Sequence, residues 1–385
     1  MNTERLMTTF LDLVKIDSPS HHEAGVAAYC EGALSALGFE VCYDDSASET
    51  GSDTGNLIAR LEGDSRETLV LSSHMDCVEP CRGVEPHIEG GIITSMGDTV
   101  LGSDDKAGIA AILEAVRTVV AGGRPRPTLI VVFTTCEEMS CVGAKCLDVA
   151  RLGLAESGGE RETGSAPSDP VACVVFDADG APGSIILGSP YHYTFCARIT
   201  GRAAHAGVEP ETGVSAIEVA ARAIDTVTWG RLDECTTANV GLIEGGREVN
   251  IVAPECVVRG ECRSLYGDRA EEVRECISAT FATAADEAGA EVAMEWRLDY
   301  PGILYETTDP LISRLAQAAE DVGLPVSYCI SGGGADANVF AAKGLKPVTL
   351  GIGMTNFHSV DEHIAVEDLE NAARFAEAII ERWRD

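Results

Sequence analysis

The sequence has few basic residues and no long apolar segment. Of its 385 residues, 28 are Lys or Arg and 62 are Asp or Glu, which gives a formal net charge of −34. A surface of this charge repels the phosphates of nucleic acids and anionic lipids, so we expect neither a nucleic-acid nor a membrane partner. No stretch approaches the ~18 continuous apolar residues of a membrane span. Residues 1–16 mix charged side chains into an apolar face, unlike a signal peptide, and a cytoplasmic protein is predicted.

Cysteine pairs with Cys-x-x-Cys spacing are also missing. The 14 cysteines are scattered, and none forms the Cys-x-x-Cys spacing typical of zinc knuckles and redox sites. Several, such as Cys173, Cys196 and Cys329, lie in apolar runs. We therefore expect buried free thiols in a reducing compartment. A cysteine nucleophile is not indicated, because no Cys–His arrangement is favoured by the sequence.

Apolar strands and amphipathic helices alternate in the first part of the chain, which predicts an α/β fold. Several expected strands are apolar throughout, as in a sheet that is covered on both faces. Apolar residues at helical spacing between Ile109 and Val120 predict a helix that ends at Gly122-Gly123. The strands are expected at residues 39–43, 57–61, 68–73, 128–135 and 172–176.

A different pattern begins at Tyr193 and predicts an inserted domain. Its order is strand, helix, strand, strand, helix, strand, which is the βαββαβ or ferredoxin-like unit. These elements are expected at residues 193–200, 213–229, 236–243, 255–265, 269–288 and 291–298. Helices at 309–322 and 365–384 and strands at 325–329 and 347–351 then resume the first pattern. We therefore predict a domain of residues 192–300 inserted into a domain of residues 1–191 and 301–385, with a surface loop at 156–170.

The first candidate site residues follow the strand expected at 68–73. This strand runs into His74-Met75-Asp76, and residues two apart in a strand point to the same side. A metal-bound imidazole commonly donates its other ring N–H to a carboxylate. We therefore predict His74 as a metal ligand and Asp76 as its orienting partner.

Two adjacent carboxylates precede the helix expected at Ile109. In the segment LGSDDKAG, Asp104 and Asp105 lie between a glycine-containing turn and the helix start. We predict that Asp104 bridges two cations. Asp105 stays an alternative, because the sequence does not fix the direction of either side chain.

Acidic residues also follow the next two apolar strands. Glu137 and Glu138 come directly after the strand at 128–135, where carboxylates are costly unless they reach solvent or a cation. One of them can bind metal while the other takes a proton from a metal-activated water. Asp177 stands at the exit of the following strand, and Asp179 is the alternative ligand two residues on.

The last apolar strand leads to His358. The polar residues that follow these strands are thus expected to converge on one edge of an open α/β sheet, which is where such sheets place their sites. Nitrogen and oxygen ligands without thiolate suit zinc, with manganese or cobalt as substitutes. Five ligands with one shared carboxylate imply two ions per chain. The predicted ligands are His74, Asp104, Glu138, Asp177 and His358.

Several strings resemble the di-zinc exopeptidase superfamily that includes peptidase T, carboxypeptidase G and acetylornithine deacetylase. The resemblance covers nearly the whole chain, and it is more specific for the superfamily than for the substrate. The segments at 90–108 and 353–364 are most similar to peptidase T and its relatives. The strings are HMD at 74–76, LGSDDKAG at 101–108, CEE at 136–138, GRAAHAG at 201–207 and NFHS at 356–359.

This resemblance implies a mixed-sheet catalytic domain with an inserted ferredoxin-like lid and dimerisation domain. It implies that Glu137 is the general base and Asp76 the orienting carboxylate, and that two zinc ions are bound. His205 matches a histidine that reaches the partner subunit's site in a homodimer. The substrate-binding positions that match are His205, Asn250, Arg263, Gly333 and Asn338.

The resemblance also implies an activity, the hydrolysis of short peptides by a tripeptidase-like aminopeptidase. Asp177 favours this activity, because deacylases and carboxypeptidases of the superfamily often carry Glu there. An N-acyl amino-acid deacylase or a carboxypeptidase is the alternative enzyme. A catalytically silent metal-dependent binding protein is the alternative outside enzymes, although it would be expected to lack Glu137 and Asp76.

Overall fold

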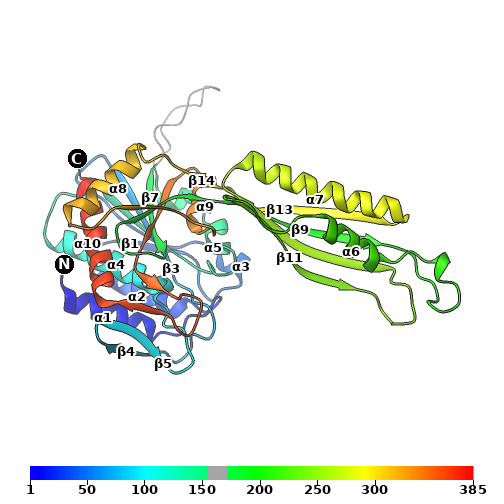
Figure 1. Ribbon diagram of the computed structural model, residues 1–385. Coiled ribbons are helices and arrows are strands. Elements are labelled where there is room, and N and C mark those ends of the chain that lie inside the picture. The colour runs from blue at the N-terminus through cyan, green and yellow to red at the C-terminus, as the bar shows by residue number, and fades with distance from the viewer. Residues whose placement is uncertain (155–170, 385) are drawn as a thin grey trace. The chain divides into compact units, whose positions relative to one another are not determined.

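The computed structural model describes residues 1–154 and 171–384, which form two compact units (Figure 1). Unit 1 comprises Met1–Leu187, Tyr305–Ile330 and Ala335–Asp385. Unit 2 comprises Gly188–Leu304 and Ser331–Gly334. The insertion predicted at 192–300 falls within unit 2, and the loop predicted at 156–170 lies outside the described residues.

A mixed sheet forms the centre of unit 1, as predicted. Its order is β1-β2-β6-β3-β7-β16-β8, and β15 also pairs with β8. Strands β6, β3, β7 and β16 are parallel neighbours, so their carboxyl ends lie at the same edge of the sheet. The strands are β1 (Glu40–Tyr43), β2 (Leu57–Leu61), β3 (Thr68–His74), β6 (Thr128–Thr134), β7 (Ala172–Ala178), β8 (Ser184–Ser189), β15 (Ser327–Ile330) and β16 (Lys346–Gly351).

Helices cover both faces of this sheet. Its strands carry apolar residues on both faces, and these side chains are buried under the helices. In β3, Leu69 and Leu71 belong to a core that includes the helices α1, α4, α8 and α10, while the buried Val70 points to the opposite face. On that opposite face α9 packs against β16 and β7. The helices of unit 1 are α1 (Thr3–Val14), α2 (Ala24–Ser35), α3 (Ala47–Thr50), α4 (Ser103–Ala121), α5 (Val142–Cys146), α8 (Pro310–Asp321), α9 (Asp336–Ala342) and α10 (Val366–Arg382), with a 3-10 turn at Val149–Leu152.

A small antiparallel sheet in unit 1 was not predicted. Its order is β17-β18-β5-β4, with β4 (Glu85–Glu89), β5 (Ile92–Met96), β17 (Met354–Thr355) and β18 (His363–Ala365). β4 is largely exposed, β5 has one buried residue, and β17 and β18 contain only two and three residues, so the apolar runs that mark the central strands are missing here. The sheet joins the segment before α4 to the segment after His358.

Unit 2 contains a five-stranded antiparallel sheet of order β10-β11-β12-β9-β13. The four longer strands and the two helices follow the predicted βαββαβ order, and β10 is an additional edge strand. Helices α6 and α7 pack on the sheet around Phe195, Ile277 and Phe281. The elements are β9 (Tyr191–Thr200), α6 (Ala216–Thr226), β10 (Gly230–Asp233), β11 (Thr236–Gly245), β12 (Glu255–Ser264), α7 (Gly267–Ala288), β13 (Glu291–Tyr300) and β14 (Ile303–Leu304), with a 3-10 turn at Pro210–Thr212.

The cysteines and the helices bear on two further expectations. All 14 cysteines are free, as predicted, and Cys173 is buried. The expected burial of Cys329 is wrong, because β15 is exposed along its length, and Cys196 is only partly buried. None of the helices in the described ranges has the length and apolar character that crossing a membrane requires.

A close approach at Gly108 fixes the start of α4 against β7. A Cβ at this position would lie 2.3 Å from the backbone oxygen of Phe176 and 2.6 Å from Asp105 Oδ1. We expect Gly108→Ala to lower the free energy of unfolding by ~1–3 kcal/mol through overpacking. The measurement is urea denaturation.

Gly32→Ala is the matched control, because Gly32 also lies in a helix but has no atom within 4 Å of an added Cβ. Alanine should stabilise the helix there by ~0.5–1 kcal/mol. Equal stabilities of the two variants would contradict the close approach.

Candidate metal centre

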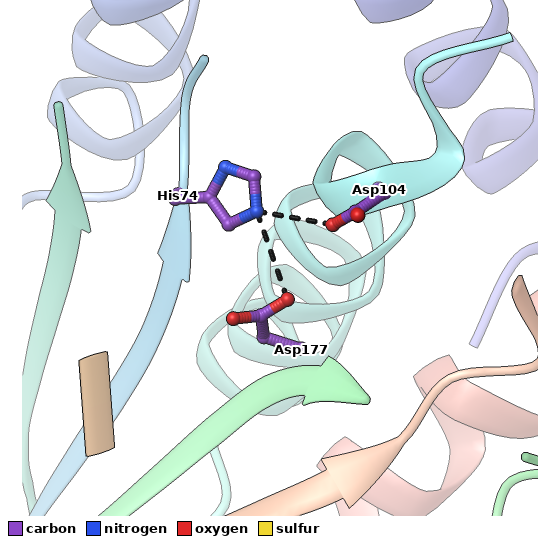
Figure 2. Close-up of side chains that lie close together, drawn as sticks. All are labelled: His74, Asp104 and Asp177. Carbon is purple, nitrogen blue, oxygen red and sulfur yellow. Dashed lines mark hydrogen bonds and ion pairs between the residues drawn. The ribbon is translucent and has the colours of Figure 1, made fainter. Parts of the chain in front are cut away.

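His74 and two carboxylates meet at the carboxyl edge of the unit 1 sheet. His74 is the last residue of β3, and its Nε2 lies 3.0 Å from Asp104 Oδ1 and 3.6 Å from Asp177 Oδ1 (Figure 2). Asp104 comes from the first turn of α4, and Asp177 comes from the end of β7. The three side chains thus converge from three elements on one point.

His358 brings a second group of ligand atoms to the same place. Its Nε2 lies 3.2 Å from Asp104 Oδ2 and 3.0 Å from Glu138 Oε2. The two oxygens of Asp104 therefore face two different histidines. This is the arrangement of a carboxylate that bridges two ions, with His74 and Asp177 on one side and Glu138 and His358 on the other.

The two alternatives left open by the sequence lie elsewhere. Asp105 is buried, and its Oδ2 accepts hydrogen bonds from the Ser73 hydroxyl and, at 3.2 Å, from the backbone N–H of His74. Asp179 is exposed. Among the described residues, neither belongs to a group of side chains that could hold a metal ion. Asp105 instead supports the end of β3.

The cluster buries more negative than positive charge. Burial raises the pKa of Asp177 to about 6 and the pKa of Glu138 above its ordinary value. Burial acts on Asp104 in the same direction, but hydrogen bonds with His358 and His74 outweigh it and hold the pKa of Asp104 below its ordinary value. Hydrogen bonds to Asp104 and Glu138 raise the pKa of His358 to about 10.

This donor set fits divalent cations. Three carboxylates and two imidazoles offer oxygen and nitrogen atoms but no thiolate, the ligand set of zinc and its substitutes. Buried carboxylates in excess are costly unless cations compensate them. The five predicted ligands are thus brought together in an arrangement that two ions would satisfy.

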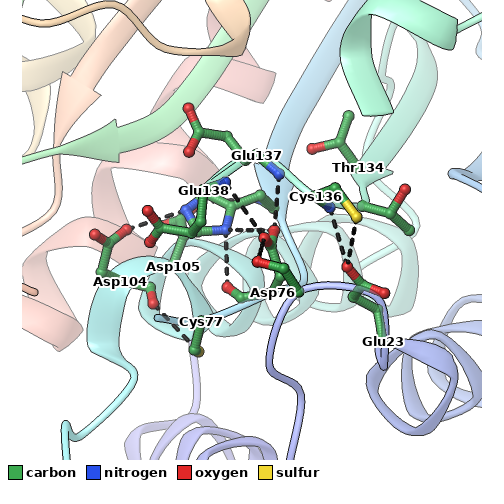
Figure 3. A network of polar contacts seen from close by, with 12 residues as sticks. Glu23, Asp76, Cys77, Asp104, Asp105, Thr134, Cys136, Glu137 and Glu138 are labelled. Atoms are coloured by element: carbon green, nitrogen blue, oxygen red, sulfur yellow. Dashed lines mark hydrogen bonds and ion pairs between the residues drawn. The ribbon is translucent and has the colours of Figure 1, made fainter. Parts of the chain in front are cut away.

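Asp76 holds the turn that carries Glu137 and Glu138. Its carboxylate accepts hydrogen bonds from the backbone N–H of Glu137 at 3.0 Å and of Glu138 at 3.3 Å, and from the Ser20 hydroxyl at 2.7 Å (Figure 3). The Nδ1 of His74 lies 2.9 Å from the backbone oxygen of Asp76 and 3.4 Å from its Oδ1. Asp76 therefore orients His74 mainly through its backbone and the acidic turn through its side chain.

Two buried glutamates that the sequence analysis missed hold the same loops. Glu23 accepts a hydrogen bond at 3.0 Å from the backbone N–H of Cys136, which has a φ of 50° (Figure 3). Glu362 accepts from the backbone N–H of Gly102 at 2.7 Å and of Asp104 at 2.9 Å. Glu362 lies in the string NFHSVDEHI and could have been found there, whereas nothing in the sequence marks Glu23.

The chain matches the model of peptidase family M20/M25/M40 over residues 70–382. It belongs to this family. The predicted resemblance to the di-zinc exopeptidases is thereby confirmed.

Three relatives of this M20-family chain are similar over its whole length. The uncharacterized protein YqjE of Bacillus subtilis is 38% identical over 382 residues, which cover 99% of each chain. Aminopeptidase PepT from Bacillus cereus is 38% identical in sequence, and its crystal structure matches with a TM-score of 0.90 over 100% of both chains. A tripeptidase from Staphylococcus aureus is 32% identical with a TM-score of 0.90, covering 100% of this chain and 99% of its own.

Most of the predicted substrate residues of this M20-family chain lie in unit 2. His205 and Asn250 are exposed there, and Gly333 lies in the short second segment of the unit. Asn338 lies in unit 1, where its side-chain oxygen accepts a hydrogen bond from the backbone N–H of Ala335 at the start of α9. This hydrogen bond fixes the Asn338 side chain at the first turn of that helix.

Arg263 is held within unit 2 by a carboxylate of its own strand. Its Nε and Nη2 donate to the two oxygens of Glu261 at 3.2 and 3.0 Å, and its Nη1 lies 3.5 Å from the Tyr300 hydroxyl. Burial opposes the charge of Arg263, but the hydrogen bonds to Glu261 outweigh it and raise the pKa. Glu261 thus fixes the plane of the guanidinium, and one N–H of Nη1 is left for a further acceptor beside the one that faces Tyr300.

Proposed function

We propose that the protein is a two-metal aminopeptidase that releases the N-terminal residue of short peptides, tripeptides first among them. The observation that carries the proposal is the bridging position of Asp104, whose two oxygens lie 3.0 and 3.2 Å from different histidines. Membership of a peptidase family and similarity to an aminopeptidase and a tripeptidase over the full chain support the substrate class.

The five clustered residues would hold the ions. His74 and Asp177 would bind one divalent cation, Glu138 and His358 the other, and Asp104 both. Zinc suits these ligands, and manganese or cobalt could replace it. When bound, two such cations polarise a carbonyl oxygen and lower the pKa of a water molecule.

Glu137 is the proposed general base. The backbone hydrogen bond from its N–H to Asp76 fixes it beside Glu138, so one carboxylate can bind metal while the other is free to move a proton. Glu137 accepts a proton on a carboxylate oxygen and returns it to the leaving amine of the peptide. The position of Glu137 supports this role, because its carboxylate lies within 4.8 Å of ligand atoms of His74 and Glu138.

The ferredoxin-like insertion is proposed to act as a lid and dimerisation domain. In this proposal the protein is a cytoplasmic homodimer, and His205 stabilises the oxyanion of the partner subunit's substrate. The proposed substrate-side residues are His205, Asn250, Arg263, Gly333 and Asn338.

A substrate panel tests the proposed specificity. The compounds are Ala-Ala-Ala, its N-acetyl form, its C-terminal amide, a dipeptide and N-acetylornithine, each with zinc, manganese and cobalt. We expect the free tripeptide to have the highest kcat/KM, because a free ammonium and a far carboxylate must both be held. Preference for the N-acetylated compounds would replace the aminopeptidase by the deacylase or carboxypeptidase alternative.

Arg263→Lys extends this test to the far carboxylate. The planar guanidinium can bind a carboxylate at two points, whereas an ammonium is a single compact charge. We expect kcat/KM to fall about tenfold for Ala-Ala-Ala and less for its amide, since a hydrogen bond to a charged group contributes about 1.5–3 kcal/mol. Arg259→Lys is the control, because Arg259 is an exposed residue of the same strand. An equal fall in kcat/KM with both substrates would show that Arg263 does not bind the far carboxylate.

A further inference from the structure

Glu137 also belongs to a second group of side chains that could hold a metal ion. Glu137, Cys141 and Asp336 each offer a ligand atom, and these atoms lie within 4.8 Å of one another. The Cys141 thiol donates to Glu137 Oε1 at 3.2 Å. Neither Cys141 nor Asp336 takes part in the five-residue cluster described above.

The three residues are held by separate elements of unit 1. Cys141 precedes α5, Asp336 is the first residue of α9, and Glu137 stands on the turn after β6. The backbone N–H of Cys141 donates to the backbone oxygen of Glu137 at 2.6 Å, which closes the loop between them. The cluster is therefore fixed by the fold.

Asp336 supplies an independent sign that a ligand belongs here. Its side chain is 2% exposed, and its Oδ2 accepts a hydrogen bond from the Thr134 hydroxyl. Its Oδ1 is buried without a hydrogen-bond partner among the described residues. A buried carboxylate oxygen without a partner is costly, and a cation is the partner that suits a site with a second carboxylate and a thiol.

We propose that Glu137, Cys141 and Asp336 form a third metal site, selective for thiolate-binding ions such as Zn²⁺ and Cd²⁺. Sulfur with two carboxylate oxygens is a softer ligand set than the five-residue cluster, so Mn²⁺ and Mg²⁺ should bind it poorly. Binding releases the thiol proton of Cys141 to solvent and forms a metal–sulfur bond. The ion binds the carboxylate of Glu137, which then cannot accept a proton, so excess zinc inhibits the enzyme. This inhibition rests on the proposed role of Glu137, whereas the binding does not.

Cadmium binding tests the site without reference to activity. Protein already loaded with its two ions is titrated with Cd²⁺, and the ultraviolet absorption of cadmium–thiolate bonds and the bound cadmium are measured. We expect one tight additional ion per chain, with Cys141→Ser losing this absorption and weakening binding at least about tenfold. Asp336→Asn should weaken binding by a similar factor while keeping the absorption at saturation.

Cys30→Ser is the matched control, because Cys30 is an equally buried free thiol on α2. The absence of a tight additional ion, or an equal signal in Cys141→Ser and Cys30→Ser, would overturn the site.

Peptide hydrolysis then tests the inhibition. We expect Zn²⁺ but not Mn²⁺ to inhibit the loaded enzyme, and Cys141→Ser to raise the half-inhibiting concentration at least about tenfold. Each variant is compared with its own rate without added metal. Cadmium binding without inhibition would support the third metal site but contradict the role of Glu137 as the general base. A chain that hydrolyses no peptide would contradict the proposed function and not the metal site.

Discussion

Glu137→Gln should lower kcat about a hundredfold to ten-thousandfold while both metal ions stay bound, because a general base contributes a factor of this size. The amide of Gln keeps the shape of the side chain but cannot accept the proton. Two groups of possible ligands contain Asp104, one with His74 and Asp177 and the other with Glu138 and His358, and Glu137 belongs to neither. Its removal should therefore leave the bridging cluster complete. The measurements are kcat with Ala-Ala-Ala and the metal content by elemental analysis.

Glu138→Gln is the control for this substitution, since it makes the same chemical change one residue further on. Glu138 lies 3.0 Å from His358 Nε2, so this variant should lose metal as well as activity. If Glu137→Gln lost metal and Glu138→Gln kept it, the roles of the two glutamates would be exchanged.

Asp104→Ala should lose both metal ions and all measurable activity. The two oxygens of Asp104 face His74 and His358, at 3.0 and 3.2 Å, so in the proposed site its removal takes a ligand from each ion at once. Even partners that only orient a ligand commonly contribute 10–100-fold to metal affinity, and a shared ligand should contribute more. The protein is dialysed without chelator, and its metal content is then measured.

Two variants on β7 and beyond it complete this comparison. Asp177→Ala removes a ligand from one ion only, so one ion per chain should be retained. Asp179→Ala should keep both ions, because Asp179 is exposed and outside the cluster. A full metal content in Asp104→Ala, or a loss in Asp179→Ala equal to that in Asp177→Ala, would contradict the ligand set.

The central sheet could be predicted because its strands carry continuous apolar runs. β3 and β6 are buried almost throughout, and both lead directly into polar residues. Once such strands are taken as parallel neighbours, His74 and the acidic turn after Thr134 must meet at one edge. The small second sheet has no such signal, since β17 contains two residues and β4 is mostly exposed.

The finer arrangement of the site could not be predicted, because it depends on residues far apart in the chain. The choice between Asp104 and Asp105 follows from the backbone turn at the start of α4, where both residues have non-helical φ and ψ angles. Glu23 acts on Cys136 across 113 residues, and no local pattern reports such a contact. The placement of Asp336 beside Cys141 likewise depends on how α9 and α5 pack.

The hydrogen bonds of Glu362 have a consequence for the synthesis of the protein. The loop that presents Asp104 receives its acceptor from a residue 258 positions later in the chain. A nascent chain that has emerged only as far as β16 has four of the five proposed ligands, but it lacks both His358 and the carboxylate that holds the Asp104 loop. The proposed metal centre is therefore completed only when the last part of the chain is available, and ribosome-bound fragments ending before Glu362 should capture metal poorly.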